Sequence, residues 1–265
     1  MNNSDRLPVL FIGHGSPMNA VEDNEFNRAW VSLGNSLPRP RAVLCISAHW
    51  ETSGPRVTVM QHPRTIHDFS GFPKELYDIR YPVPGSPEVA RETADVVTEA
   101  EIVFDDQWGL DHGCWSVLKS LFPNADVPVV QFSLDHYRSP QQHYDLAKNL
   151  SSLRKKGILI IGSGNMVHNL GRVAWDKMNE PEYGYDWALE ARSGMKELIF
   201  NGDHNRLIGY HQQGEAFKLA IPTAEHFLPL LYVLALQENG EEVTLFSDKV
   251  VMGSVAMTSL VIGNI

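Results

Sequence analysis

The stretch LFIGHGSPMNA, residues 10–20, decides the fold prediction for this chain. An apolar run, Val9–Ile12, predicts a buried strand, and it stops abruptly at Gly13-His14-Gly15-Ser16-Pro17. Glycine lets the backbone turn sharply and lets other groups approach closely, and a histidine packed in a core needs neither. We therefore expect His14 to be presented to a ligand at the end of a strand.

Strand-like and helix-like segments alternate along the chain on either side of this stretch. The predicted strands are Val9–Ile12, Ala42–Ser47, Arg56–Met60, Val127–Leu134, Gly157–Ile161, Val243–Phe246 and Val255–Ile262. The predicted helices are Glu25–Ser36, Pro87–Ala100, Cys114–Phe122, Pro140–Lys155, Tyr185–Phe200 and Phe227–Asn239. Strands that are apolar on both faces and separated by helices predict a mostly parallel central sheet with helices on both sides. Because no linker or repeat is visible, residues 1–265 are predicted to form a single α/β domain.

Composition narrows the class of partner. The chain has 43% hydrophobic and 20% charged residues, as soluble globular proteins do, and its net charge of −10 disfavours a nucleic-acid partner. No apolar run approaches the roughly 20 residues of a transmembrane helix, so we expect no membrane partner. Two cysteines, Cys45 and Cys114, and an N-terminus unlike a signal peptide predict reduced thiols in a cytoplasmic protein.

Eleven histidines are present, and three of them lie at the same kind of position, the carboxyl end of a predicted strand. His14, His49 and His168 lie at or just past the carboxyl ends of three predicted parallel strands, where ligands bind in such folds. His226, in AIPTAEHFLPLL, and His112, in WGLDHGCW, each precede a helix. Neutral imidazole is the commonest protein metal ligand, and three protein ligands plus an open position are typical of a catalytic metal. The pattern therefore predicts a shared metal site at the carboxyl ends of the strands.

The other histidines divide into two groups. A long loop punctuated by proline and glycine, Gln61–Ser86, can fold over a pocket, and we expect its residues His67, Asp68 and Phe69 to bind substrate. Four further histidines in polar surroundings are expected at the surface: His136, His143, His204 and His211.

Short motifs along nearly the whole chain carry a resemblance to a known family. They are Gly13-His14-Gly15-Ser16-Pro17, Ser47-Ala48-His49-Trp50-Glu51, His67-Asp68-Phe69-Ser70-Gly71-Phe72-Pro73, Tyr81-Pro82-Val83-Pro84-Gly85, Gly109-Leu110-Asp111-His112-Gly113, Gly162-Ser163-Gly164 with His168-Asn169-Leu170, and Glu225-His226-Phe227-Leu228-Pro229-Leu230. With this ordered set, the chain resembles the DOPA 4,5-extradiol dioxygenase-like proteins, a branch of the class III extradiol ring-cleavage dioxygenases. The first motif alone would be weak, because some metal-chelatase sequences carry it.

The resemblance implies roles for these residues. It implies a metal held by His14, His49 and His226, with Glu225 as the alternative to His226. It implies His168 as the acid–base residue, or at most a weaker fourth ligand, and His112 as a second catalytic histidine near the oxygen site. The implied reaction opens a small aromatic diol such as L-DOPA at its 4,5 bond with O₂, and the product is a muconate semialdehyde.

The sequence leaves open the identity of the metal and two alternatives to the dioxygenase function. Three neutral histidines suit Zn²⁺, which also outcompetes Fe²⁺ for nitrogen ligands, so we expect Zn²⁺ in the protein as isolated. Zn²⁺ has no redox chemistry, so the dioxygenase reaction would need Fe²⁺. One rival is a zinc hydrolase with Glu51, Asp111 or Glu225 as base, and the other is a non-catalytic protein that binds through its metal pocket.

Overall fold

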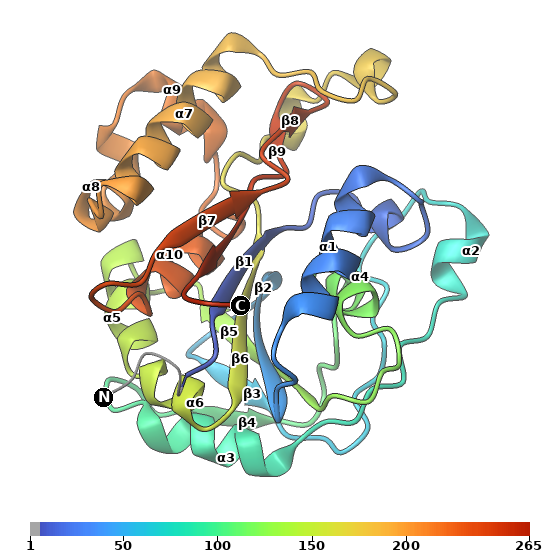
Figure 1. Ribbon diagram of the computed structural model, residues 1–265, viewed down its shortest axis with the longest axis vertical. Helices are drawn as coiled ribbons and strands as arrows, with labels where there is room; N and C mark the ends of the chain where they lie inside the picture. Colours follow the sequence, from blue (N-terminus) through green and yellow to red (C-terminus); the bar gives the residue numbers. More distant parts are fainter. Residues whose placement is uncertain (1–5) are drawn as a thin grey trace.

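A computed structural model describes residues 6–265, and its centre is an eight-stranded sheet (Figure 1). The strands of this sheet are β1 (Val9–Gly13), β2 (Ala42–Thr52), β3 (Arg56–Thr58), β4 (Val103–Asp105), β5 (Val129–Asp135), β6 (Ile158–Gly164), β7 (Val243–Phe246) and β10 (Ser259–Ile262). Their order is β4-β3-β5-β2-β6-β1-β10-β7. The central strands β5, β2, β6 and β1 are parallel, whereas β10 and β7 add antiparallel strands at one side. The predicted α/β fold with a mostly parallel sheet is confirmed.

Helices cover both faces of this sheet (Figure 1). They are α1 (Glu25–Ser36), α2 (Lys74–Tyr77), α3 (Pro87–Val96), α4 (His112–Leu121), α5 (Pro140–Lys148), α6 (Ser151–Lys155), α7 (Asp186–Phe200), α8 (His204–Ile208), α9 (Glu215–Ala220) and α10 (Leu228–Ala235). Helices α1 and α4 pack on one face, and α5, α7, α9 and α10 contribute to the core on the other. A separate hairpin joins β8 (Val250–Val251) to β9 (Val255–Ala256).

Alternate residues of the central strands supply two separate hydrophobic cores. In β1, Val9 and Phe11 belong to the core under α5 and α10, whereas Leu10 and Ile12 belong to the core under α1 and α4. Side chains of a strand alternate between the two faces of the sheet, so a strand covered on both faces must be apolar throughout. This requirement explains the apolar runs from which the sheet was predicted.

Strand register brings the carboxyl ends of β1 and β6 level with Ser47 of β2. Gly13 of β1 pairs with Gly164 of β6, and Ser47 of β2 pairs with Ser163 of β6. Residues that follow these positions therefore leave the sheet at one edge, which we call the carboxyl edge. This edge is where the sequence places its candidate ligands.

Besides shifts of up to four residues at the ends of other elements, three predicted elements differ from the structure. Strand β2 continues to Thr52, so His49 lies within it; its register with β5 shifts between Ile46 and Glu51, and such irregularities re-aim side chains. The helix predicted over Pro140–Lys155 is two helices, because the side chain of Asn149 donates to the carbonyls of Asp145 and Leu146 and ends α5. The last predicted strand is divided between β9 and β10.

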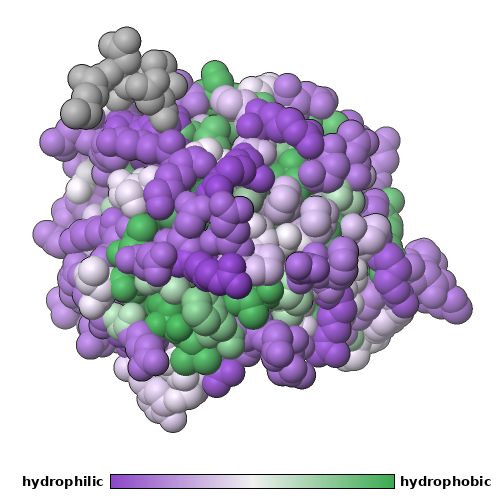
Figure 2. All heavy atoms as spheres, turned by 90° about the horizontal axis from the view of Figure 1, so that it is seen from below, coloured by the Kyte–Doolittle hydropathy of each residue, from purple (hydrophilic) through white to green (hydrophobic). Residues whose placement is uncertain are grey.

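Apolar side chains and both cysteines are placed as expected for a globular protein, with most polar groups at the surface. Seen from below, the molecule is mostly hydrophilic, with apolar side chains gathered toward one part of that face (Figure 2). Cys45 and Cys114 are both buried and free. Among residues 6–265, no helix is both long enough and apolar enough to cross a bilayer.

Candidate metal centre

Five histidines from five segments meet at the carboxyl edge. His14 follows β1, His49 lies in β2, His112 begins α4, His168 follows β6 and His226 precedes α10. The ring centroids of His14 and His49 are 5.0 Å apart, and those rings lie 5.4 and 4.9 Å from the ring of His226. His112 lies 3.9 Å from His49, and His168 stacks on His226 with centroids 3.5 Å apart. The histidines that the sequence singled out for one site are thus neighbours.

The Nε2 atoms of His14 and His49 face each other, and the groups beside their Nδ1 atoms favour tautomers in which both Nε2 atoms lack a proton. Nδ1 of His14 lies 3.0 Å from Oγ of Ser163, and that hydroxyl donates its own hydrogen to the carbonyl of Gly113. Nδ1 of His14 must therefore be the donor, which leaves a lone pair on Nε2. Nδ1 of His49 lies 3.5 Å from a carboxylate oxygen of Asp68, and the negative charge favours a proton on that nitrogen as well.

The spacing of these two lone pairs suits a metal ion. The Nε2 atoms of His14 and His49 are 3.1 Å apart, and neither has a proton to share with the other. At the usual metal–nitrogen length of about 2.0–2.1 Å, this separation corresponds to a ligand–metal–ligand angle of about 100°. Two buried acceptors facing each other are unfavourable without a cation, so the donor set fits a metal.

His226 is oriented by its neighbour in the sequence. Nδ1 of His226 lies 3.2 Å from Oε1 of Glu225, and Thr223 donates to the same oxygen. A carboxylate at Nδ1 holds the proton there and leaves Nε2 free, an arrangement common behind metal-binding histidines. Ligand atoms of His168, Glu225 and His226 all lie within 4.8 Å of one another, as do those of His14, His49 and His112. The two groups adjoin through the ring contacts of His226.

Burial keeps the central imidazoles uncharged. It lowers the pKa of His49 to about 3, with the neighbouring His112 adding to the effect, and lowers the pKa of His168 to about 4. Burial also lowers the pKa values of His14 and His226 well below the ordinary value of 6.5, and the surrounding histidines lower them further. Neutral imidazole is the form that binds metals.

Glycine is needed where the chain presents His14. Gly15 has a φ of +58°, a left-handed conformation that β-branched residues adopt only with strain. A Cβ added to Gly15 would lie 2.4 Å from the sulfur of Met257. The sharp turn after β1 therefore depends on this glycine.

The long loop after β3 reaches the carboxyl edge with some of its predicted residues. The carboxylate of Asp68 contacts His112 and His49, and the ring of Phe69 lies edge-on to His112 with centroids 5.5 Å apart. His67 does not join the histidine cluster: its Nε2 lies 3.1 Å from the carbonyl of Ile79, and its ring packs against Phe69 and Trp115. Within this loop, His67 supports the neighbouring aromatic rings.

Two polar residues of the site have structural roles that were not predicted: Ser163 had no role assigned from the sequence, and Asp111 was considered only as the base of a hydrolase. Ser163 orients His14, and Asp111 caps α4 while accepting hydrogen bonds from Ser47 and Gln131 at 2.7 and 2.6 Å. Asp111 is fully buried, and burial raises its pKa. A usable signal existed for Asp111, because an aspartate before an apolar helical run is a common N-cap. No sequence signal links Ser163 to a histidine 149 residues away.

The surface position predicted for His143 is wrong. His143 is fully buried under α10, and its Nδ1 lies 3.0 Å from the hydroxyl of Tyr232. His136 and His211 are exposed as expected, and His204 is half-buried with Nδ1 2.8 Å from the hydroxyl of Tyr144. The polar neighbours of His143 in sequence face solvent, whereas its own side of α5 faces the core.

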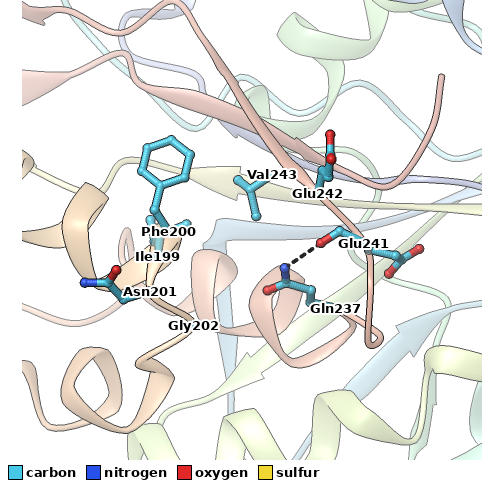
Figure 3. A pocket seen from close by; sticks show the side chains of 8 residues that line it. All are labelled: Ile199, Phe200, Asn201, Gly202, Gln237, Glu241, Glu242 and Val243. Atoms are coloured by element: carbon cyan, nitrogen blue, oxygen red, sulfur yellow. Dashed lines mark hydrogen bonds between the residues drawn. The ribbon is translucent and has the colours of Figure 1, made fainter.

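A cavity of about 460 Å³ lies at the opposite edge of the sheet (Figure 3). Phe200, Gln237 and Val243 line it, and Gln237 donates to the carbonyl of Glu241. Val243 pairs with Ile262, which pairs with Val9 at the start of β1, so the cavity lies at the end away from His14. None of the clustered histidines contributes to it.

Comparisons with known proteins agree with this geometry. A family model described as the catalytic LigB subunit of aromatic ring-opening dioxygenase matches residues 9–258. The chain is 43% identical to the 4,5-DOPA dioxygenase extradiol of Escherichia coli (strain K12) over 98% of this chain and 96% of that one. It is 37% identical to the 4,5-DOPA dioxygenase extradiol of Beta vulgaris, with 87% of each chain covered. A crystal structure of an uncharacterized Escherichia coli K12 protein matches with a TM-score of 0.84 and 38% identity, over 97% of this chain and all of that one.

Proposed function

Because the chain belongs to the LigB family of aromatic ring-opening dioxygenases, we propose that it is a metal-dependent enzyme that cleaves a catechol such as L-DOPA at the 4,5 bond. Both atoms of O₂ enter the product, a muconate semialdehyde, so the reaction needs no external reductant. The relatives named as 4,5-DOPA dioxygenases support this substrate class. The observation that carries the proposal is the pair of Nε2 atoms of His14 and His49, which face each other 3.1 Å apart.

His14, His49 and His226 would hold the metal. Each of these rings has an acceptor beside Nδ1, namely Ser163, Asp68 or Glu225, so that each keeps a lone pair on Nε2. Glu225 would act behind His226 as its hydrogen-bond partner rather than as the ligand. His112 is a less suitable ligand, because the positive end of the α4 dipole disfavours a cation beside it.

Fe²⁺, when bound, would supply the electron transfer from the catecholate to O₂ that Zn²⁺ cannot supply. His168, stacked on His226, would take a proton from a catechol hydroxyl at a ring nitrogen and later return it to an oxygen atom of the ring-opened product. His112 carries its proton on Nδ1, so its Nε2 would accept a hydrogen bond from a substrate hydroxyl. Phe69, edge-on to His112, would form an aromatic wall for a planar ring.

The hydrolase alternative has less support from Asp111 and Glu225, two of the three carboxylates considered as its base. Both oxygens of Asp111 already accept hydrogen bonds from Ser47, Gln131 and the Cys114 amide in a fully buried position. Oε1 of Glu225 is used by Thr223 and His226. A general base must be within reach of a water molecule, and Asp111 has no free oxygen for one.

The test is a comparison of two metal-loaded preparations of the same apoprotein. One is loaded with Fe²⁺ without air and the other with Zn²⁺, and each then receives L-DOPA and O₂. We expect the iron-loaded enzyme to consume one O₂ for each ring opened, and the zinc-loaded enzyme to consume none. Ring opening with zinc alone, or the absence of O₂ uptake in both, would contradict the proposal.

A further inference from the structure

Asp68 lies between two histidines that belong to different elements. Its Oδ2 is 2.9 Å from Nδ1 of His112 in α4 and 3.5 Å from Nδ1 of His49 in β2. Its Oδ1 accepts the backbone N–H of His112 at 2.8 Å. The side chain is only 17% exposed. Asp68 therefore accepts two hydrogen bonds from His112, and its carboxylate also lies beside Nδ1 of His49.

The loop that carries Asp68 is fastened to the start of α4. The Ile66 amide donates to the carbonyl of Leu110 at 2.7 Å, and the Leu110 amide donates to the carbonyl of Arg64 at 2.9 Å. The indole of Trp115 in α4 donates to the carbonyl of Ile66 at 2.7 Å. These bonds hold Asp68 against His112, and the position does not depend on substrate.

The contacts of Asp68 determine which nitrogen of His112 carries the proton. A carboxylate only accepts hydrogen bonds, so Nδ1 of His112 must be the donor and Nε2 keeps its lone pair. The same negative charge favours the proton on Nδ1 of His49 and the lone pair on its Nε2. The Asp68 carboxylate thereby sets the tautomer of His112 and favours the matching tautomer of His49, the ring that faces His14.

We propose that Asp68 is a positioning residue of the ring-cleavage site and acts through His112 and His49, with no contact to substrate. The inference rests on the proposed function, since it gives Asp68 a purpose in that reaction. It replaces the substrate-binding role expected for Asp68 from the sequence, because both oxygens are already engaged by protein groups.

The first test is the tautomer of His112, read by nitrogen NMR of ¹⁵N-histidine-labelled, zinc-loaded protein. In Asp68→Asn the amide oxygen can still accept the His112 backbone N–H, which turns the NH₂ group toward Nδ1. We expect the His112 proton to move from Nδ1 to Nε2 in this variant, whereas Asp68→Ala should give a mixture of tautomers. Asp78→Asn is the matched control, because Asp78 belongs to the same loop and pairs with the exposed Lys74. An unchanged His112 tautomer in Asp68→Asn would overturn the proposal.

The second test is kinetic and uses the iron-loaded enzyme with L-DOPA. Loss of a partner behind a functional histidine costs about 10–100-fold in activity, and we expect that loss in kcat with little change in KM. In a His112→Ala background, Asp68→Asn should cost much less than it does alone, because its main route of action is gone. A raised KM in both backgrounds would mean that Asp68 binds substrate directly, contrary to the proposal.

The two proposals fail in distinguishable ways. If the iron-loaded wild type opens no ring, the proposed function is wrong, and the tautomer measurement on the zinc-loaded protein still decides whether Asp68 orients His112. If the wild type is active and the His112 tautomer stays the same in Asp68→Asn, only the role of Asp68 is wrong.

Discussion

The two edges of the central sheet bury polar side chains in different ways. At the amino edge, near the start of β1, the guanidinium of Arg154 is 1% exposed and donates to the carbonyls of Leu7 and Leu236 and to both oxygens of Glu241. Glu241 also accepts from Arg6 at 2.8 Å. Donors and acceptors there satisfy one another within the protein.

At the carboxyl edge, two hydrogen-bond acceptors face each other without a donor between them. The Nε2 atoms of His14 and His49 face each other at 3.1 Å while their Nδ1 atoms are engaged by Ser163 and Asp68. A buried polar group without a partner destabilises the folded protein. The polar groups of the amino edge are thus satisfied by the protein alone, whereas the carboxyl edge holds acceptors that a bound cation would satisfy.

The largest expected effect separates two histidines within the carboxyl edge. His168→Ala should keep the metal and lower the rate of ring opening about 10²–10⁴-fold, the usual contribution of general acid–base catalysis. His14→Ala should instead lose the metal, because it removes a ligand nitrogen. Metal content by elemental assay and turnover are measured on both iron-loaded variants. Loss of metal from His168→Ala would make His168 a ligand and remove the distinction.

At the amino edge the expected effect is on stability alone. Glu241→Gln leaves the Arg154 guanidinium buried without its countercharge, and breaking such a pair costs about 3 kcal/mol. We expect a lower free energy of unfolding in urea, with metal stoichiometry and kcat unchanged. Glu242→Gln makes the same chemical change at an exposed neighbour and serves as the control. A drop in metal binding in Glu241→Gln would show that the two edges are coupled.

The sequence predicted those parts of the carboxyl edge that depend on local pattern. An apolar run located β1, and His14 and His168 were both predicted to lie at the carboxyl ends of parallel strands. The partners of these histidines could not be predicted in this way, because Asp68 and His112 are 44 residues apart and meet only after the loop packs on α4. Pattern locates a strand end, whereas a hydrogen-bond partner across the fold depends on tertiary packing.

His143 shows how a local pattern can also be misread. Its neighbours Gln141, Gln142 and Asp145 are polar, so the segment suggested a surface position. Helical spacing gives a different answer, because His143, Leu146 and Ala147 share one face of α5 and all three are fully buried. The periodicity of the helix was the better signal at this position.

The remaining prediction concerns this buried histidine, whose protonation affects stability only in acid and has no expected effect on the carboxyl edge. Burial lowers the pKa of His143 to about 4; Asp135 of β5 raises it somewhat, and Arg138 lowers it. Tyr232 of α10 is the other titratable group at its ring and is neutral, because burial raises its pKa. In the unfolded chain a histidine has its ordinary pKa of about 6.5.

The sign of the effect follows from these two pKa values. Between pH 6.5 and about 4 the unfolded chain binds the proton and the folded protein does not, so stability falls as the pH falls through this window. The loss of unfolding free energy attributable to His143 approaches about 3 kcal/mol near pH 4, and it is absent above pH 7.

We expect His143→Asn to lower the free energy of unfolding at every pH but to reduce its dependence on pH between 6.5 and 4. His211→Gln, at an exposed site that is solvated in both states, should leave that dependence as in the wild type. Urea unfolding of the three proteins at half-unit steps of pH measures the slopes. Equal slopes in wild type and His143→Asn would mean that His143 takes up its proton in the folded state as readily as in the unfolded chain. In that case the acid sensitivity of the fold would come from other groups, among them the histidines of the carboxyl edge and the paired carboxylates Asp105 and Glu241.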